Sequence, residues 1–166
     1  IRGLGVTTSD SEAIIEVAQP HDAEALGVLF HEDMTHLGEP TEPGAQVSMA
    51  RVMLEDAHSE DPSCLCIVAR PEQGAAARGV LLANYTWSPK FAARTLWIET
   101  LYVSPEMRRR GLGRALVEWL LDWAEDHNTP GVDIEAYRGN TPASVLYRTM
   151  GFRRLGRERF VYRFGG

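Results

Sequence analysis

Residues 99–116, which read ETLYVSPEMRRRGLGRAL, constrain the fold more than any other part of the 166-residue chain. An apolar strand pattern here runs through an arginine-rich turn into an amphipathic helix. Gly111 and Gly113 carry no side chain, so a ligand can come close to the backbone N–H groups. The first turn of a helix has unpaired N–H groups and the positive end of the helix dipole. The turn therefore indicates a site for pyrophosphate or a similar polyanion, surrounded by Arg108, Arg109, Arg110 and Arg114.

Two common phosphate-binding motifs do not fit this turn. The dinucleotide fingerprint G-x-G-x-x-G requires a third glycine at position 116, where the chain has Leu116. The P-loop pattern G-x-x-x-x-G-K-[ST] does not occur in the chain. The plainer alternative is a solvated, arginine-rich helix entry that binds nothing. The place of the motif in the order of strands and helices favours the polyanion site.

Hydrophobic periodicity and turn signals predict alternating strands and helices along the chain. Thr141 is expected to cap the last helix and Gly151 to follow its end. No repeat or long linker divides residues 13–166, which are expected to form one domain. Residues 1–12 are expected to be a disordered leader or an artificial remnant. The predicted strands are 13–17, 64–69, 79–87, 95–103, 132–137, 152–155 and 158–164, and the predicted helices are 22–37, 47–58, 111–127 and 142–150.

Composition excludes several classes of protein. The net charge of −6 argues against nucleic acid as the main partner, because phosphate backbones favour basic surfaces. No apolar run is long enough for a membrane helix and no signal-peptide pattern occurs, so a cytoplasmic protein is expected. Cys64 and Cys66 are interpreted as strand-packing residues rather than a disulfide or a metal site. Glu32 and His36 are spaced i, i+4, but no third ligand accompanies them, so no metal is expected.

The segment 140–152, which reads NTPASVLYRTMGF, carries a second motif. It matches N-x-x-A-x-x-x-Y-x-x-x-G-F at every position. With Arg108-x-x-Gly111-x-Gly113 and the order of elements, it makes nearly the whole chain resemble the GNAT superfamily of N-acetyltransferases. The resemblance implies a mixed α/β (α+β) fold with a twisted mixed sheet of six to seven strands and about four flanking helices. In the family, acetyl-CoA lies where the fourth and fifth strands splay apart.

The resemblance implies two catalytic residues. Tyr147 would protonate the leaving thiolate of coenzyme A, since a phenol with a pKa of about 10 carries its proton at neutral pH. The alternative is a core tyrosine on a helical stripe. Glu99 would accept the proton of the amine through water, and a carboxylate within an apolar strand is costly unless it faces a cleft or a cation. Strand alternation would put it on one face with Thr95, Trp97 and Leu101; its alternative is an ion pair within the sheet.

Coenzyme A would, by the same resemblance, contact backbone and side-chain groups in two segments. The backbone after Glu99 would pair with the pantetheine arm like an added strand. Asn140 would contact that arm or simply serve as a turn residue. Glu32, Asp33, Glu39 and Glu42 could attract a cationic amine or be merely solvated. The expected cofactor-binding residues are Leu101, Tyr102, Val103, Arg108, Arg109, Arg110, Gly111, Leu112, Gly113, Arg114, Asn140 and Ser144.

The function implied is direct transfer of an acetyl group from acetyl-CoA to a primary amine of a small molecule in a ternary complex. The motifs also resemble the diamine or polyamine N-acetyltransferase branch, although Arg108–Arg110 and Phe152 depart from its pattern. The acceptor stays open between a polyamine, a lysine-like amine, an aminoglycoside and a protein N-terminus or lysine. The alternative to an enzyme is a non-catalytic acyl-CoA-binding module of the same fold. A homodimer without nucleic-acid or membrane partners is expected.

Overall fold

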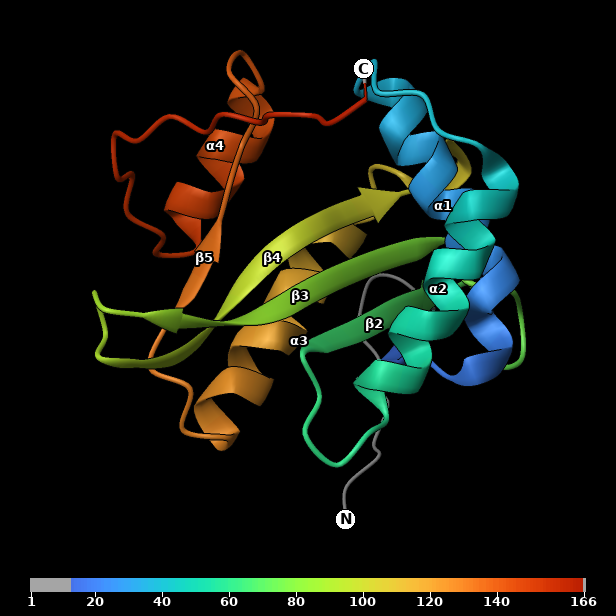
Figure 1. Ribbon diagram of the computed structural model, residues 1–166, viewed down its shortest axis with the longest axis horizontal. Helices are drawn as coiled ribbons and strands as arrows, with labels where there is room; N and C mark the ends of the chain where they lie inside the picture. The colour runs from blue at the N-terminus through green and yellow to red at the C-terminus, as the bar shows by residue number, and fades with distance from the viewer. Residues whose placement is uncertain (1–12, 166) are drawn as a thin grey trace. The chain divides into compact units, whose positions relative to one another are not determined.

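Five strands form one mixed sheet in the order β1-β2-β3-β4-β5 in the computed structural model, which describes residues 13–165 (Figure 1). Each strand is antiparallel to the next except β5, which is parallel to β4. The predicted leader, residues 1–12, lies outside the described residues. The sheet belongs to a unit that ends at Glu135, and a second unit starts at Ala136. The strands are β1 (Ile14–Val17), β2 (Cys64–Arg70), β3 (Gly79–Ser88), β4 (Ala93–Val103) and β5 (Val132–Ile134).

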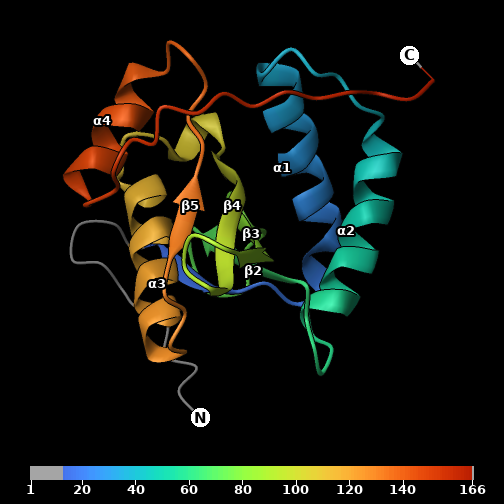
Figure 2. The same cartoon turned by 60° about the vertical axis from the view of Figure 1, so that its left-hand side comes forward.

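Helices cover both faces of this sheet (Figures 1 and 2). Two of them, α1 (Ala23–His36) and α2 (Pro43–Ala57), pack on one face, and α3 (Leu112–Asp126) packs on the other. Short 3-10 turns precede α1 (Pro20–Asp22) and α3 (Pro105–Met107). All seven residues of β2 are buried because helices lie on both sides of the strand. Cys64 and Cys66 are free thiols within the core under α1 and α2, which confirms their packing role.

Local chemistry explains where two helices begin. Helix α2 starts at Pro43 rather than at the predicted residue 47, because proline at the first helical position lacks only an N–H that would be unpaired anyway. In the second unit, α4 (Thr141–Thr149) is capped by Asn140, whose Oδ1 accepts the Ala143 N–H at 3.2 Å. The predicted cap, Thr141, is instead the first helical residue. Gly151 follows the helix with a φ of +95°, as expected for a residue beyond the last turn.

Strand β4 separates from β5 partway along its length. The two strands are paired at Leu96, Trp97 and Ile98, and β5 ends at Ile134. Residues 99–103 continue along β3 alone. The predicted splay between the fourth and fifth strands is therefore confirmed, although β5 is three residues shorter than the predicted strand 132–137.

A β-bulge interrupts the pairing of β3 with β4. Leu82 pairs with Thr100 and its neighbour Ala83 pairs with Ile98, so Glu99 is the extra residue on β4. Beyond the bulge the alternation of side chains shifts by one position. Leu101 consequently pairs with Leu81, whereas Trp97 pairs with Asn84, which points to the opposite face of β3. The prediction that Leu101 shares a face with Trp97 and Glu99 was wrong for this reason.

The two closing strands predicted over 152–155 and 158–164 are not formed. Residues 152–163 have irregular backbone, and no strand among the described residues pairs with them, so the sheet has five strands rather than six or seven. An alternating pattern favours an extended chain, but a strand also needs the hydrogen-bonding edge of a neighbour. The apolar side chains of this segment are exposed, among them Phe160, Val161, Tyr162 and Phe164.

Candidate active site

The half of β4 beyond Ile98 presents one side of its backbone without a strand partner among the described residues. Such an edge can take up an extended ligand that carries amide groups, as if the ligand were a further strand. Leu101, Tyr102 and Val103 lie on this edge, where the sequence places the pantetheine contacts. The Tyr102 side chain is buried, and its hydroxyl donates to Glu32 Oε2 at 3.2 Å. Only the backbone of Tyr102 is therefore available to a ligand.

Glu99 occupies the bulge and is exposed. The indole Nε1–H of Trp97 donates to Glu99 Oε2 at 3.0 Å, so the two side chains share a face of the sheet. This is the face that α1 and α2 cover farther along β4, as shown by Tyr102 in their core cluster. The bulge thus aims a carboxylate away from the core at the point where the β4 edge becomes open.

The arginine turn follows directly from this edge. Arg108 donates its Nε–H to the Val103 carbonyl at 3.0 Å and lies over the Tyr102 ring at 5.5 Å. Arg114 donates to Glu118 Oε1 one turn along α3, at 2.8 Å. Arg109 and Arg110 are exposed and form no ion pair with the described residues.

The start of α3 has the features of an anion site. Gly111 takes a left-handed conformation with φ +71° and precedes the helix, which has no side-chain cap. A Cβ atom built on Gly113 would meet nothing within 4 Å, so packing within the described chain does not require glycine there. The Leu112 side chain is buried in the core and anchors the turn from below. The uncapped N–H groups of the first turn and the bare surface over Gly113 fit a phosphate group.

A further buried group lies between β4 and this turn. The Ser104 hydroxyl is buried and has no hydrogen-bond partner among the described residues. Ser104 also begins the 3-10 turn that leads to the arginines. Sequence analysis did not select Ser104, and a serine between a strand and a proline carries no signal that would distinguish it from an ordinary turn residue.

The remaining predicted residues belong to α4 in the second unit and are described by their own surroundings. Asn140 is the helix cap, which bears out its interpretation as a residue of the turn and leaves its role toward coenzyme A a prediction. Ser144 lies half-buried in the next turn. Burial raises the pKa of Tyr147 above its usual value of 10. The ring meets Phe152 edge-on, with centroids 5.9 Å apart.

Helix α1 contributes two carboxylates near the open end of β4. Glu32 is held by the Tyr102 hydroxyl. Asp33 is buried, and burial raises its pKa to about 6 against the opposing charges of His36 and Arg108. Neither residue is merely solvated, which was one of the two interpretations left open by the sequence. The positive charge of Arg108 in the arginine turn therefore acts on a carboxyl group of α1.

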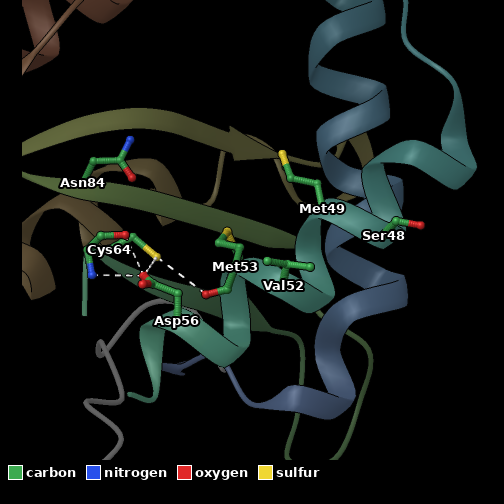
Figure 3. Close-up of a pocket in the computed structure, with 8 residues that line it drawn as sticks. Ser48, Met49, Val52, Met53, Asp56, Cys64 and Asn84 are labelled. Atoms are coloured by element: carbon green, nitrogen blue, oxygen red, sulfur yellow. Dashed lines mark hydrogen bonds between the residues drawn. The ribbon is translucent and has the colours of Figure 1, made fainter. Parts of the chain in front are cut away.

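A cavity of about 670 Å³ lies between α2 and the strands β2 and β3 (Figure 3). Sequence analysis missed it. Its one sequence signal is Asn84, a polar residue within the apolar pattern of β3. The helix contributes Met49, Val52, Met53 and Asp56, and the strands contribute Cys64 and Asn84.

Two classes of feature do not occur in the part of the chain that the structure describes. No helix there is both long and apolar enough to cross a membrane. No group of three or more His, Cys, Asp or Glu side chains within residues 13–165 is placed to hold a metal ion.

The fold and the two motifs define an acetyltransferase of the GNAT class, and comparison with known proteins agrees. The model of the acetyltransferase (GNAT) family matches residues 11–152, so the chain belongs to this family and is an N-acetyltransferase. Streptothricin acetyltransferase of Streptomyces lavendulae is 28% identical over 94% of this chain and 89% of its own. The N-alpha-acetyltransferase RimI of Mycobacterium tuberculosis is 39% identical, but over 42% of either chain.

A solved structure shows the same fold. The structure of AAC(6′)-Iy in complex with the bisubstrate analogue CoA-S-monomethyl-acetylneamine has a TM-score of 0.71 to this chain. The alignment covers 92% of this chain and 98% of the AAC(6′)-Iy chain, at 15% sequence identity. At this identity the likeness concerns the fold alone.

Proposed function

We propose that the enzyme transfers the acetyl group of acetyl-CoA directly to a primary amine of a small molecule. The observation that carries the proposal is the sequence of features that begins at the bulge at Glu99, follows the open edge of β4 and ends at the uncapped, glycine-rich start of α3. The edge can take the amide-bearing arm of coenzyme A and the helix start can take its pyrophosphate. Arg109 and Arg110 would add positive charge beside the phosphates.

The chemistry needs one proton removed and one supplied. The amine must lose a proton before or during its attack on the thioester carbonyl, and Glu99 would receive it through water. The nitrogen then bonds to the carbonyl carbon, the bond from carbon to sulfur breaks, and the thiolate leaves. Tyr147 would protonate that thiolate, and its raised pKa keeps the phenol protonated at neutral pH. Binding both substrates together removes most of the entropic cost of their encounter.

The acceptor is proposed to be a small molecule because of how far each relative matches. The streptothricin acetyltransferase aligns over nearly the full length of this chain, including α1 and α2, which cover the sheet face that carries Glu99. A protein N-terminus is the second candidate, favoured by the higher identity to RimI, but that match spans less than half of either chain. Streptothricin, a polyamine, a lysine-like amine and an aminoglycoside are therefore the first compounds to test.

The test is a panel of these amines and an N-terminal peptide, incubated with acetyl-CoA and assayed for release of free coenzyme A thiol. Both protein cysteines are buried, so they should contribute little background to a thiol reagent. We expect turnover with at least one small amine. Glu99→Gln should lower turnover and flatten the acidic limb of the pH–rate profile without changing the KM for acetyl-CoA. Release of thiol with no amine, while acetyl-CoA still binds, would instead identify a non-catalytic acyl-CoA-binding module.

A further inference from the structure

Three residues on neighbouring strands form a row across the sheet face that carries Glu99. Cys64 of β2 pairs with Asn84 of β3, and Asn84 pairs with Trp97 of β4. Residues paired in register point to the same face, so this row runs from the cavity to the Trp97 indole that holds Glu99. Two strand spacings separate its ends, a distance of about 10 Å.

This row lies at the border of the part of the sheet that α1 and α2 cover. The next rows, built on Leu82 and Val80, lie in the core beneath α1 and α2. On the outer row, Asn84 and Trp97 are only half-buried and Glu99 is exposed. The wall above it is apolar, since Met49 and Val52 of α2 are 46% and 67% exposed. The cavity is lined by Cys64 and Asn84 of this row (Figure 3), and the next residue of the row is Trp97, whose indole holds Glu99.

Asp56 lies at the far end of this row. Its Oδ2 accepts the Ser63 N–H at 3.0 Å, the Ser63 hydroxyl at 2.7 Å and the Cys64 thiol at 3.4 Å (Figure 3). These hydrogen bonds, led by that of the Ser63 side chain, lower the pKa of Asp56, so the carboxylate is charged at neutral pH. The backbone of Cys64 also lowers the pKa of Asp56, and none of the three hydrogen bonds above uses Oδ1.

The charges around the cavity favour a cation at Asp56. None of the lining residues is basic. Asp56 lies in the last turn of α2, at the negative end of the helix dipole, and that turn contains no basic residue. Arg94, which contacts the neighbouring loop, is paired with Asp61 and the Pro62 carbonyl.

We propose that the acceptor is a diamine with an apolar spacer, whose second ammonium group binds Asp56 while its reacting amine lies near Glu99. This inference rests on the proposed function and narrows its substrate class. Met49, Val52 and Met53 contact the methylene spacer, and methionine side chains adapt to chains of slightly different length. A rigid, hydroxyl-rich aminoglycoside would find few hydrogen-bonding groups in this cavity and is a poor fit.

Equilibrium binding tests the proposal without requiring turnover. The full-length protein is titrated calorimetrically with straight-chain diamines of increasing length, each compared with the monoamine of the same length. We expect the best diamine to bind about tenfold more tightly than its monoamine. Asp56→Asn should abolish this preference. Glu55→Gln removes the same charge from the neighbouring, exposed position of α2 and should leave the preference intact.

A second variant covers the case in which Asp56→Asn does not fold. Val52→Lys changes an exposed side chain and places an ammonium group at the cavity, so it should weaken the binding of the diamine more than that of the monoamine. Equal binding of diamine and monoamine by the wild type, or an unchanged preference in a folded Asp56→Asn variant, overturns the inference. Intact diamine preference without acetyl transfer to any amine would contradict the proposed function instead. Transfer to diamines and monoamines with equal kcat/KM would contradict only the inference.

Discussion

The pKa values of two aspartate side chains show how the surroundings of an ionisable group set its charge. The pKa is raised at Asp33 and lowered at Asp56. Asp33 is buried on α1 and its pKa is raised to about 6 by loss of solvent, which the charges of His36 and Arg108 offset only in part. The pKa of Asp56 is lowered, because the Ser63 hydroxyl, followed by backbone and thiol donors, stabilises its charged form.

The buried carboxylate of Asp33 should reduce stability at neutral pH. Its folded pKa lies above the unfolded value of 3.8, so the folded state binds the extra proton between about pH 4 and 6 and stability falls as pH rises through that window. The shift of about two units sets an upper limit of roughly 3 kcal/mol. Asp33→Asn should therefore raise the free energy of unfolding by about 1–3 kcal/mol at pH 7.5.

Urea unfolding at several pH values measures this effect. The gain from Asp33→Asn should shrink as the pH falls below 6 and disappear as the pH falls below 3.8, where the wild-type carboxyl becomes protonated in both states. Glu60→Gln, which changes an exposed carboxylate, should show no gain at any pH. A gain for Asp33→Asn that is independent of pH would mean that packing, rather than charge, causes the change.

Tyr147→Phe removes one hydroxyl from α4 and tests the proposed acid. Turnover should fall by about 10²-fold, because the thiolate would leave without a proton donor, while the affinity for acetyl-CoA stays near wild type. Steady-state kinetics and calorimetric titration with coenzyme A give the two quantities. Tyr162→Phe, at an 81% exposed tyrosine of the same unit, is the matched control and should be neutral. Wild-type turnover in Tyr147→Phe would leave Tyr147 a packing residue.

Among the elements, the beginnings of α2 and α3 offer a matched comparison. Each is a 15-residue helix with glycine at its second position, Gly44 in α2 and Gly113 in α3. A Cβ atom at either glycine would meet nothing within 4 Å. Neither glycine is therefore required by packing of the described chain, and only the one on α3 belongs to the proposed pyrophosphate site.

Gly113→Ala should separate a binding role from a folding role. The added methyl group would occupy the space through which phosphate approaches the helix N–H groups, so coenzyme A should bind about tenfold more weakly, a loss of about 1.4 kcal/mol. Gly44→Ala should bind coenzyme A like the wild type. Both changes should hold or raise the melting temperature, because alanine restricts the unfolded chain more than glycine does. Equal affinity in the two variants would exclude a phosphate over Gly113.

At the scale of the whole molecule, the burial of both cysteines helps to decide between direct acetyl transfer and transfer through an acetylated enzyme. An enzyme that stores the acetyl group on itself needs a reactive nucleophile, commonly a thiolate. Burial raises the pKa of Cys64 to about 12 and also raises that of Cys66, so both remain protonated thiols. The chain has no other cysteine. These surroundings support direct transfer between two bound substrates.

Initial-rate kinetics with both substrates varied should accordingly give intersecting rather than parallel double-reciprocal plots. Mass spectrometry of the enzyme incubated with acetyl-CoA alone should show no added acetyl group. Cys66→Ala and Cys64→Ala should lose stability through the missing packing atoms yet keep the kinetic pattern. An acetylated enzyme that transfers its group to an amine would refute direct transfer.

The sequence alone determined the order of most elements, the packing role of the cysteines, and the glycine-rich turn before α3. These features depend on residues close together in the chain: helical and alternating periodicities, proline and glycine at helix ends, and polar caps. The sequence also placed Glu99 in a strand and Tyr147 on the last helix. Their family motifs are short enough to be read without knowing the fold.

Only the tertiary structure decided the features that depend on pairing between distant segments. The bulge at Glu99 exists because β3 and β4 pair with unequal numbers of residues, and it moves Leu101 to the other face. Helix α2 completes the cavity beside Asn84 of β3. Residues 152–163 alternate like a strand but have no strand partner in the described chain. The local periodicity of a segment favours a helix or a strand. Strand register, the face on which a side chain lies and the position of a cavity depend on which distant segments pack together.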